Sequence, residues 1–157
     1  MREISSLAEA SRLVGQELAV TDWHDISQTR VNQFAEATGD HQWIHTDVER
    51  SRRESPFGGT IAHGFLTLSL LPMMLEQAIV IRDVRMAVNY GLNKARFPAP
   101  VPVGSRLRGR ITLAAMETIA GGAQLQWNML VECDGSDKPV CVAEVIVRCY
   151  TGHAGTA

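Results

Sequence analysis

The segment from Gly64 to Ile81 is the feature that most restricts how this chain can fold. Its side chains are apolar on nearly every side of a helix, which is typical of a helix enclosed by other structure. Ser69, Pro72 and Glu76 interrupt the apolar run, so it does not fit a membrane span. Because proline removes a backbone donor and clashes with the preceding turn, we expect a kink or a break at Pro72.

The remainder of the second half predicts β-strands. Alternating stretches are separated by Gly, Pro and Asp, without a helical pattern between the later ones. They cover Val84–Tyr90, Leu92–Phe97, Ser105–Met116, Ala123–Cys133 and Pro139–Tyr150. From residue 123 to residue 133, odd positions are apolar and even positions largely polar, so one face is expected to be buried. Asp134 to Asp137 predicts a hairpin turn, and the whole region predicts an antiparallel meander.

The first half predicts shorter elements. We expect a short helix over Ile4–Leu13, extended chain over Leu18–Ile26, a helix over Gln28–Thr38 and an irregular region over 41–60. Ser27 can cap the helix that starts at Gln28, and Gly39 can end it in the left-handed conformation. That helix end would fix the direction in which Asp40 leaves it.

Helices followed by strands indicate an α+β protein. An antiparallel sheet curled around one apolar helix is the hot-dog fold, which we predict as a single domain over 1–157 with a frayed tail at 151–157. An open curled sheet leaves unpaired edges, and hot-dog protomers usually pair. We therefore expect a homodimer.

Composition narrows the classes of partner. The formal net charge of −2 gives no general attraction to nucleic acid or to an anionic membrane. The N-terminal residues carry charges and lack the continuous apolar stretch of a secretory signal, so we expect a cytoplasmic protein. Cys133, Cys141 and Cys149 are odd in number and lack CxxC spacing, which predicts reduced core thiols and neither disulfides nor a zinc site. We expect no metal.

Asp40 and His45 place a carboxylate and an imidazole in one short loop after the expected helix end. Such a pair can hold one water molecule, with one group accepting its proton while the other orients it or returns a proton to a substrate. Asp and His are also common in turns and helix caps, so the spacing alone favours a structural role.

A glycine-rich loop, Gly58-Gly59, leads to His63-Gly64 at the start of the apolar helix. Free N–H groups at a helix start can stabilise the negative charge of a thioester enolate. The alternative is a connection whose glycines only allow a tight turn. Ser69 can reach back to Asp40, although a serine in a buried helix more often bonds its own preceding turn.

Two blocks of sequence carry a family resemblance, ATGDHQWIHTD over 37–47 and PFGGTIAHGFL over 56–66. They resemble the MaoC-like dehydratases, in particular the small, mycobacterial-type (R)-specific enoyl-CoA hydratases with a single hot-dog domain. Similarity extends from Val14 to Tyr150, which is most of the chain. The family pattern often has Asn-Pro-(Ile/Leu)-His where this chain has Gln42 to His45 without a proline.

The resemblance implies a lyase of fatty acid metabolism that adds water syn to a trans-2-enoyl thioester, carried by CoA or an acyl carrier protein, without a cofactor. It implies that Asp40 and His45 are the catalytic pair, that the Gly64 N–H holds the thioester oxygen, and that Ser69 supports Asp40. Further substrate-binding candidates are Gly59, His63, Asn93, Lys94 and Arg96.

Other assignments stay open at the level of the sequence. Arg106, Arg108 and Arg110 could meet a phosphate group, but alternating arginines on one sheet face more often form a solvated surface. A hot-dog thioesterase would hydrolyse the same kind of substrate, so the fold does not decide between the two reactions. A non-catalytic acyl-binding or heterodimer subunit would keep the pocket without turnover.

Overall fold

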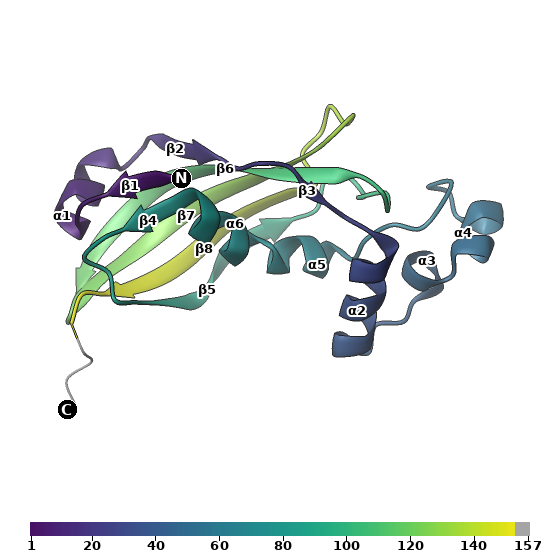
Figure 1. Cartoon of the computed structure of the whole chain (residues 1–157), viewed down its shortest axis with the longest axis horizontal. Coiled ribbons are helices and arrows are strands. Elements are labelled where there is room, and N and C mark those ends of the chain that lie inside the picture. The colour runs from purple at the N-terminus through teal and green to yellow at the C-terminus, as the bar shows by residue number, and fades with distance from the viewer. Residues whose placement is uncertain (153–157) are drawn as a thin grey trace.

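The chain folds into a long, curled sheet that holds helices on its concave side and carries further helices beyond one end (Figure 1). The computed structural model of the chain describes residues 1–152. Its six-stranded sheet has the order β2-β6-β7-β8-β5, with β3 also beside β6, and all of its strand pairs are antiparallel. These strands are β2 (Glu17–Val20), β3 (His24–Asp25), β5 (Met86–Arg96), β6 (Arg106–Ile119), β7 (Gly122–Cys133) and β8 (Cys141–Tyr150).

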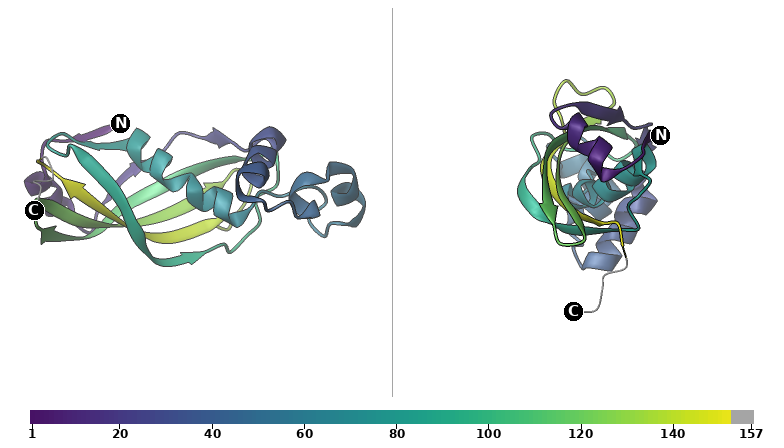
Figure 2. Two further views of the ribbon diagram at one scale, coloured as in Figure 1. Left: turned by 90° about the horizontal axis from the view of Figure 1, so that it is seen from below. Right: turned by 90° about the vertical axis from the view of Figure 1, so that its left-hand side faces the viewer.

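A separate pair of short strands and a series of short helices complete the fold. The strands β1 (Arg2–Ile4) and β4 (Ile79–Ile81) pair in parallel. The helices are α1 (Leu7–Ala10), the 3₁₀ turn η1 (Ser11–Leu13), α2 (Gln28–Thr38), α3 (Trp43–Thr46), α4 (Val48–Glu54), α5 (Gly64–Ser69) and α6 (Leu71–Ala78). Figure 2 shows α5 and α6 along the inner side of the curled sheet, and α2, α3 and α4 at its end. The arrangement is the predicted α+β hot-dog fold.

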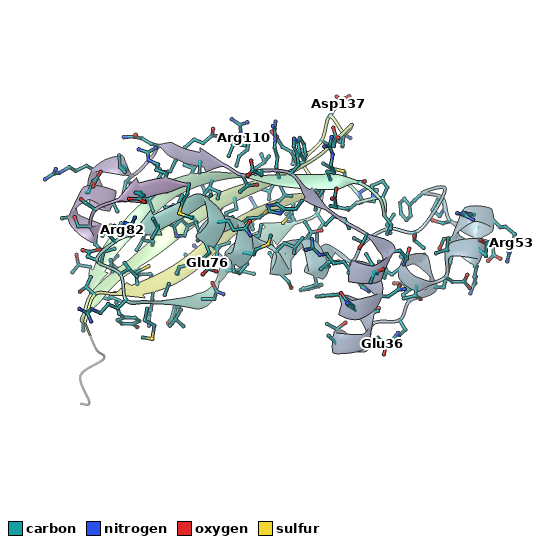
Figure 3. All side chains as sticks on the ribbon, viewed as in Figure 1. Glu36, Arg53, Glu76, Arg82, Arg110 and Asp137 are labelled. Carbon is teal, nitrogen blue, oxygen red and sulfur yellow. The ribbon has the colours of Figure 1, made fainter. Side chains whose placement is uncertain are left out.

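The long apolar helix expected over Gly64–Ile81 is two helices followed by a strand. The break falls at Leu70, and Pro72 occupies the first turn of α6, where a missing N–H costs no helical hydrogen bond. The prediction of enclosure on all sides was also wrong, because Phe65 is 69% exposed. Glu76 of α6, labelled in Figure 3, is also exposed.

Other local predictions met mixed outcomes. The helix over Gln28–Thr38, its cap at Ser27 and its left-handed end at Gly39 are confirmed. The helix expected over Ile4–Leu13 begins only at residue 7, because residues 2–4 pair with β4 as a strand. The irregular region expected over 41–60 contains α3 and α4, and the second of these is capped by Asp47, whose carboxylate accepts the N–H of Arg50 at 2.9 Å.

The predicted strands are present with shifted ends. Two of them, Val84–Tyr90 and Leu92–Phe97, are one strand, β5, which continues through irregularities in its pairing with β8 near Gly91. On β7 the odd positions from 123 to 133 are all buried, as the alternation predicted. The buried apolar residues form one core cluster, whose members come from positions between Ile4 and Cys149.

The cysteines behave as core residues. Cys133, Cys141 and Cys149 are buried and reduced, as expected, and burial raises the pKa of the Cys141 and Cys149 thiols to about 11. The tail expected to be frayed, 151–157, lies outside the described residues from position 153 onward. Within residues 1–152, no helix is both long and apolar enough to cross a membrane.

Candidate active site

Asp40 is aimed by the end of α2. Gly39 takes the left-handed conformation, with φ of 77°, and its N–H donates to the carbonyl oxygen of Ala35 at 2.8 Å. The next residue, Asp40, therefore leaves the helix in a fixed direction. Its side chain is 55% exposed, so this carboxylate is open to solvent and to a ligand.

His45 lies in α3 and is held by the chain segment that precedes α5. Its side chain is buried, and its Nδ1 lies 2.7 Å from the carbonyl oxygen of Ile61. Because a carbonyl oxygen can only accept, Nδ1 carries the proton and Nε2 keeps its lone pair. The N–H of Ile61 donates in turn to the carbonyl oxygen of Ile44 at 3.0 Å. These two hydrogen bonds hold the ring in place and leave Nε2 available as a base.

His63 connects Asp40 to His45. Its Nε2 lies 2.9 Å from the backbone carbonyl oxygen of Asp40 and 4.0 Å from the Asp40 carboxylate. Both partners are acceptors, so Nε2 carries the proton. The ring of His63 is 3% exposed, stacks on His45 with centroids 3.8 Å apart, and contacts Phe34 at 5.0 Å. In this structure His63 serves to hold the loop of Asp40.

The three side chains form one compact polar cluster. Ligand atoms of Asp40, His45 and His63 lie within 4.8 Å of one another. Two hydrogen bonds of about 2.8 Å that meet at one tetrahedral water span roughly 4.6 Å, so a single water can bridge the carboxylate and an imidazole nitrogen. The donor set fits a metal poorly, because Nε2 of His63, the ring atom beside Asp40, donates its proton to the backbone carbonyl oxygen of Asp40 and so offers no lone pair to an ion.

The environment of His45 favours its neutral form. Burial is the main cause that lowers the pKa of His45 below its ordinary value of 6.5, and the hydrogen bond to Ile61 opposes this effect. The neighbouring His63 lowers the pKa further, and the Asp40 carboxylate raises it. The net direction is downward, so Nε2 remains an unprotonated base to a lower pH than in a free histidine.

This direction gives a measurable expectation. In an NMR titration of the imidazole Cε1–H signals, His45 should take up its proton below pH 6.5 because protonation requires a charge in a buried site. Loss of one signal in His45→Gln assigns the resonance. By linkage, the stability contributed by the neutral ring is fully present above the pKa of the unfolded state, and it is lost as the pH falls from there through the lower pKa of the folded state. A His45 midpoint at or above 6.5 would contradict the expected effect of burial.

A cleft of about 350 Å³ opens beside this cluster. His45 and Gly64 both line it, together with the aromatic rings of Phe57 and Phe97. Gly64 is the first residue of α5, where an N–H has no partner within the helix. A basic nitrogen and a backbone donor therefore border one partly apolar cleft, which suits a substrate with an apolar chain and a carbonyl oxygen.

The structure places the other predicted residues less centrally. The hydroxyl of Ser69 donates to the carbonyl oxygen of Phe65 at 2.7 Å, and among the described residues no hydrogen bond joins Ser69 to Asp40. Asn93 and Lys94 lie exposed on β5, where the Asn93 amide reaches Gln126 at 3.4 Å. Arg96 ends β5, directly before the cleft residue Phe97, whereas Gly59 is half-buried in the loop before α5.

The arginines of β6 already have acidic partners. Arg106 pairs with Asp134, Arg108 pairs with Glu132 at 2.6 Å, and Arg110 pairs with Glu17 at 2.8 Å. Glu36 lies on α2, the helix that leads to Asp40. In Figure 3, Arg110 is labelled at the upper side of the molecule and Glu36 at the lower side. This agrees with the solvated sheet face that the alternation favoured.

Several residues of the site were not predicted as functional from the sequence. Phe97 and Thr67 line the cleft, and the carbonyl oxygen of Ile61 sets the protonation of His45. The proline-rich stretch after Phe97 was visible in the sequence, but only the fold brings it opposite α5. No sequence signal marks Ile61, because its contact is made by the backbone.

Comparison with known proteins decides the family. The model of the MaoC like domain matches residues 9–128. The chain belongs to the MaoC-like family. It is 52% identical over 149 residues to the 3-hydroxyacyl-thioester dehydratase Z of Mycobacterium tuberculosis, covering 94% of this chain and 98% of that protein. It is 45% identical over 149 residues to the nodulation protein N of Rhizobium leguminosarum bv. viciae, covering 93% of this chain and 91% of that protein.

A solved structure agrees with the fold of this MaoC-like protein. The R-hydratase PhaJ1 from Pseudomonas aeruginosa superposes with a TM-score of 0.72 at 22% identity, covering 88% of this chain and 83% of that chain. At this identity the likeness supports the hot-dog architecture. The resemblance stated for the motifs over 37–47 and 56–66 is thereby confirmed at the level of the family.

Proposed function

We propose that this MaoC-like protein is an (R)-specific enoyl thioester hydratase, which adds water reversibly to a trans-2-enoyl thioester and so acts in reverse as a 3-hydroxyacyl thioester dehydratase. The approach of the Asp40 carboxylate and the His45 ring to within 4.8 Å, beside a cleft lined by Gly64, carries the proposal. The 52% identity to a 3-hydroxyacyl-thioester dehydratase over nearly the full length of both chains supports the reaction class.

The proposed chemistry assigns each group one task. Water is held between the Asp40 carboxylate and Nε2 of His45, and loses a proton to this pair as its oxygen bonds to C3. The C2–C3 π electrons move towards the thioester oxygen, where the N–H of Gly64 stabilises the enolate charge. When the carbonyl re-forms, C2 takes a proton from the pair, so protons balance and no electron donor or other cofactor is required.

The direct test is the loss of enoyl thioester absorbance in the ultraviolet with crotonyl-, octenoyl- and dodecenoyl-CoA, combined with chiral analysis of the product. We expect the (R)-3-hydroxyacyl thioester. An (S)-product would contradict the proposed stereochemistry. Release of free CoA would indicate a thioesterase, and binding without turnover would indicate an acyl-binding subunit.

The carrier of the acyl group is proposed to approach along the end of β5. Lys94 and Arg96 are exposed there, and within residues 1–152 neither makes an ion pair. Cationic side chains of this kind suit the phosphates of CoA or of a carrier-bound phosphopantetheine. Asn93, Gly59 and His63 are retained as candidate substrate contacts, and Ser69 as a candidate support of Asp40.

We also propose a homodimer that forms through β5. This edge strand has 11 residues and is exposed along nearly its whole length. Its exposed side chains include several large apolar ones, which a soluble edge strand normally avoids. They are Met86 at 44%, Val88 at 43%, Tyr90 at 57% and Leu92 at 47%. A second copy of β5 would satisfy the free backbone groups and cover these side chains.

Leu92→Glu is expected to shift the protein towards monomer in multi-angle light scattering at micromolar concentration, because a buried charge at the new strand pair is unfavourable. The matched control is Val20→Glu on β2, at the opposite edge of the sheet, where the residue is similarly exposed at 42%. This variant should remain dimeric. A stable wild-type monomer would contradict the homodimer.

The remaining proposals concern the chain as a whole. We infer one domain over 1–157, and the single cluster of buried residues from Ile4 to Cys149 supports this inference. The cytoplasmic location expected from the N-terminal sequence stays a prediction.

A further inference from the structure

Gln28, the first residue of α2, joins two chain segments that meet at His45. Its Nε2 donates one hydrogen bond to the backbone carbonyl oxygen of His45 at 2.7 Å and one to Oδ1 of Asn32 at 2.8 Å. Its Oε1 accepts the hydroxyl proton of Thr60 at 2.6 Å. Both amide N–H groups are thus used, and the amide plane is fixed from three directions.

The contacts of Gln28 lie next to those that hold the imidazole. Thr60 is buried and directly precedes Ile61, whose carbonyl oxygen accepts the Nδ1 proton of His45. Ile61 also donates its N–H to the carbonyl oxygen of Ile44. Gln28 therefore links the two segments that hold the imidazole. It accepts from the side chain of Thr60, one residue before Ile61, and donates to the backbone carbonyl oxygen of His45.

We propose that Gln28 is a positioning residue for the imidazole of His45, with Thr60 as its partner. The inference rests on the proposed function for its kinetic readout, but not for its spectroscopic one. The role requires a donor and an acceptor on one rigid plane, which an amide supplies. Methionine has a similar shape without these bonds, and glutamate would turn a second acceptor towards the His45 carbonyl oxygen. Motion of the backbone by a fraction of an ångström would misplace Nε2 relative to the Asp40 carboxylate.

The test compares Gln28→Met with Asn32→Ala as a matched control. Asn32 accepts a hydrogen bond from the same amide, and among residues 1–152 no side-chain hydrogen bond joins it to His45, Thr60 or Ile61. We expect Gln28→Met to lower kcat for crotonyl-CoA by roughly tenfold or more while KM stays within about twofold, because misplacement of a catalytic group affects turnover more than binding. Asn32→Ala should change kcat by less than about twofold. Equal effects of the two substitutions would overturn the proposal.

A double-mutant cycle separates positioning from general destabilisation. If Gln28 acts through His45, Gln28→Met should cost little further activity in a His45→Gln background, whereas a merely structural effect would be retained in full. Full additivity would overturn the proposal. The imidazole NMR titration of His45 gives the second readout, and it should shift in Gln28→Met and not in Asn32→Ala.

The titration distinguishes failure of this inference from failure of the proposed function. A wild-type protein without hydratase activity would contradict the function, and the His45 shift would still decide the role of Gln28. If Gln28→Met does not fold, the pair Thr60→Val and Thr60→Ser replaces it, because serine keeps the hydroxyl donor and valine does not. Loss of kcat and a His45 shift in valine alone support the proposal, and equal behaviour of the two overturns it.

Discussion

Asp40→Asn and His45→Gln are each expected to lower the turnover of crotonyl-CoA by at least ~100-fold, the low end of a general acid–base contribution. Asparagine keeps the shape of Asp40 and its backbone carbonyl, which bonds His63, but it cannot accept the proton of water. Glutamine at position 45 can still donate to Ile61 but offers no basic nitrogen. The double substitution should cost little more than either single one, because the two groups act on one water.

Controls for this pair come from the same stretch of chain. His41 has a side chain that is 51% exposed, and Asp47 caps α4 through its carboxylate. His41→Gln and Asp47→Asn should retain activity within about threefold, since asparagine caps a helix as well as aspartate does. Turnover of crotonyl-CoA by each variant is measured from the ultraviolet absorbance, by stopped-flow or in the steady state. Thermal unfolding curves of the same samples show whether each variant is folded. Full activity in Asp40→Asn or in His45→Gln would remove that residue from the mechanism.

The sequence predicted best where the determining interactions are local. The bounds of α2 follow from a serine cap, a helical apolar period and a glycine that takes the left-handed conformation, all within 13 residues of chain. The direction of Asp40 follows from the same signals. The alternation on β7 was equally reliable, because a sheet with one buried face imposes a period of two residues.

The features that the sequence did not predict depend on pairing between distant segments. Residues 79–81 continue an apolar run that reads as helix, but pairing with β1 draws them into a strand. The contact of His45 with Ile61 spans 16 residues, and that of Gln28 with Thr60 spans 32. Backbone carbonyls and a lone glutamine leave no pattern in a single sequence. The candidate pair, Asp40 and His45, could therefore be named from motifs, whereas the groups that hold the two side chains could be found only from the fold.

Gly64→Ala is expected to lower kcat/KM for crotonyl-CoA by roughly 100-fold, comparable to the loss of one oxyanion-stabilising donor. A Cβ at this position would lie 2.9 Å from Cδ2 and 3.0 Å from Cγ of Phe97, which is closer than carbon atoms normally approach. These atoms are the base of a ring and cannot move without turning the side chain. Since Phe97 lines the cleft beside Gly64, either its ring or the start of α5 must shift. A shift of α5 moves the Gly64 N–H relative to His45, and a shift of the ring changes the cleft in which the thioester would lie.

Two further variants decide whether this steric account is correct. Gly152→Ala is the control, because a Cβ there meets no atom within 4 Å, the backbone is not in the left-handed region, and the residue has no place in the proposed site. It should keep activity within about threefold. In Gly64→Ala combined with Phe97→Leu, the smaller side chain leaves room for the new methyl group, so kcat should recover relative to Gly64→Ala alone. If Gly64→Ala alone is fully active, the Gly64 amide is not in the oxyanion position. If kcat of the double variant is no higher than that of Gly64→Ala, the clash with Phe97 is not the cause of the loss. Glycine would then be required because the bound thioester itself occupies the space of the methyl group.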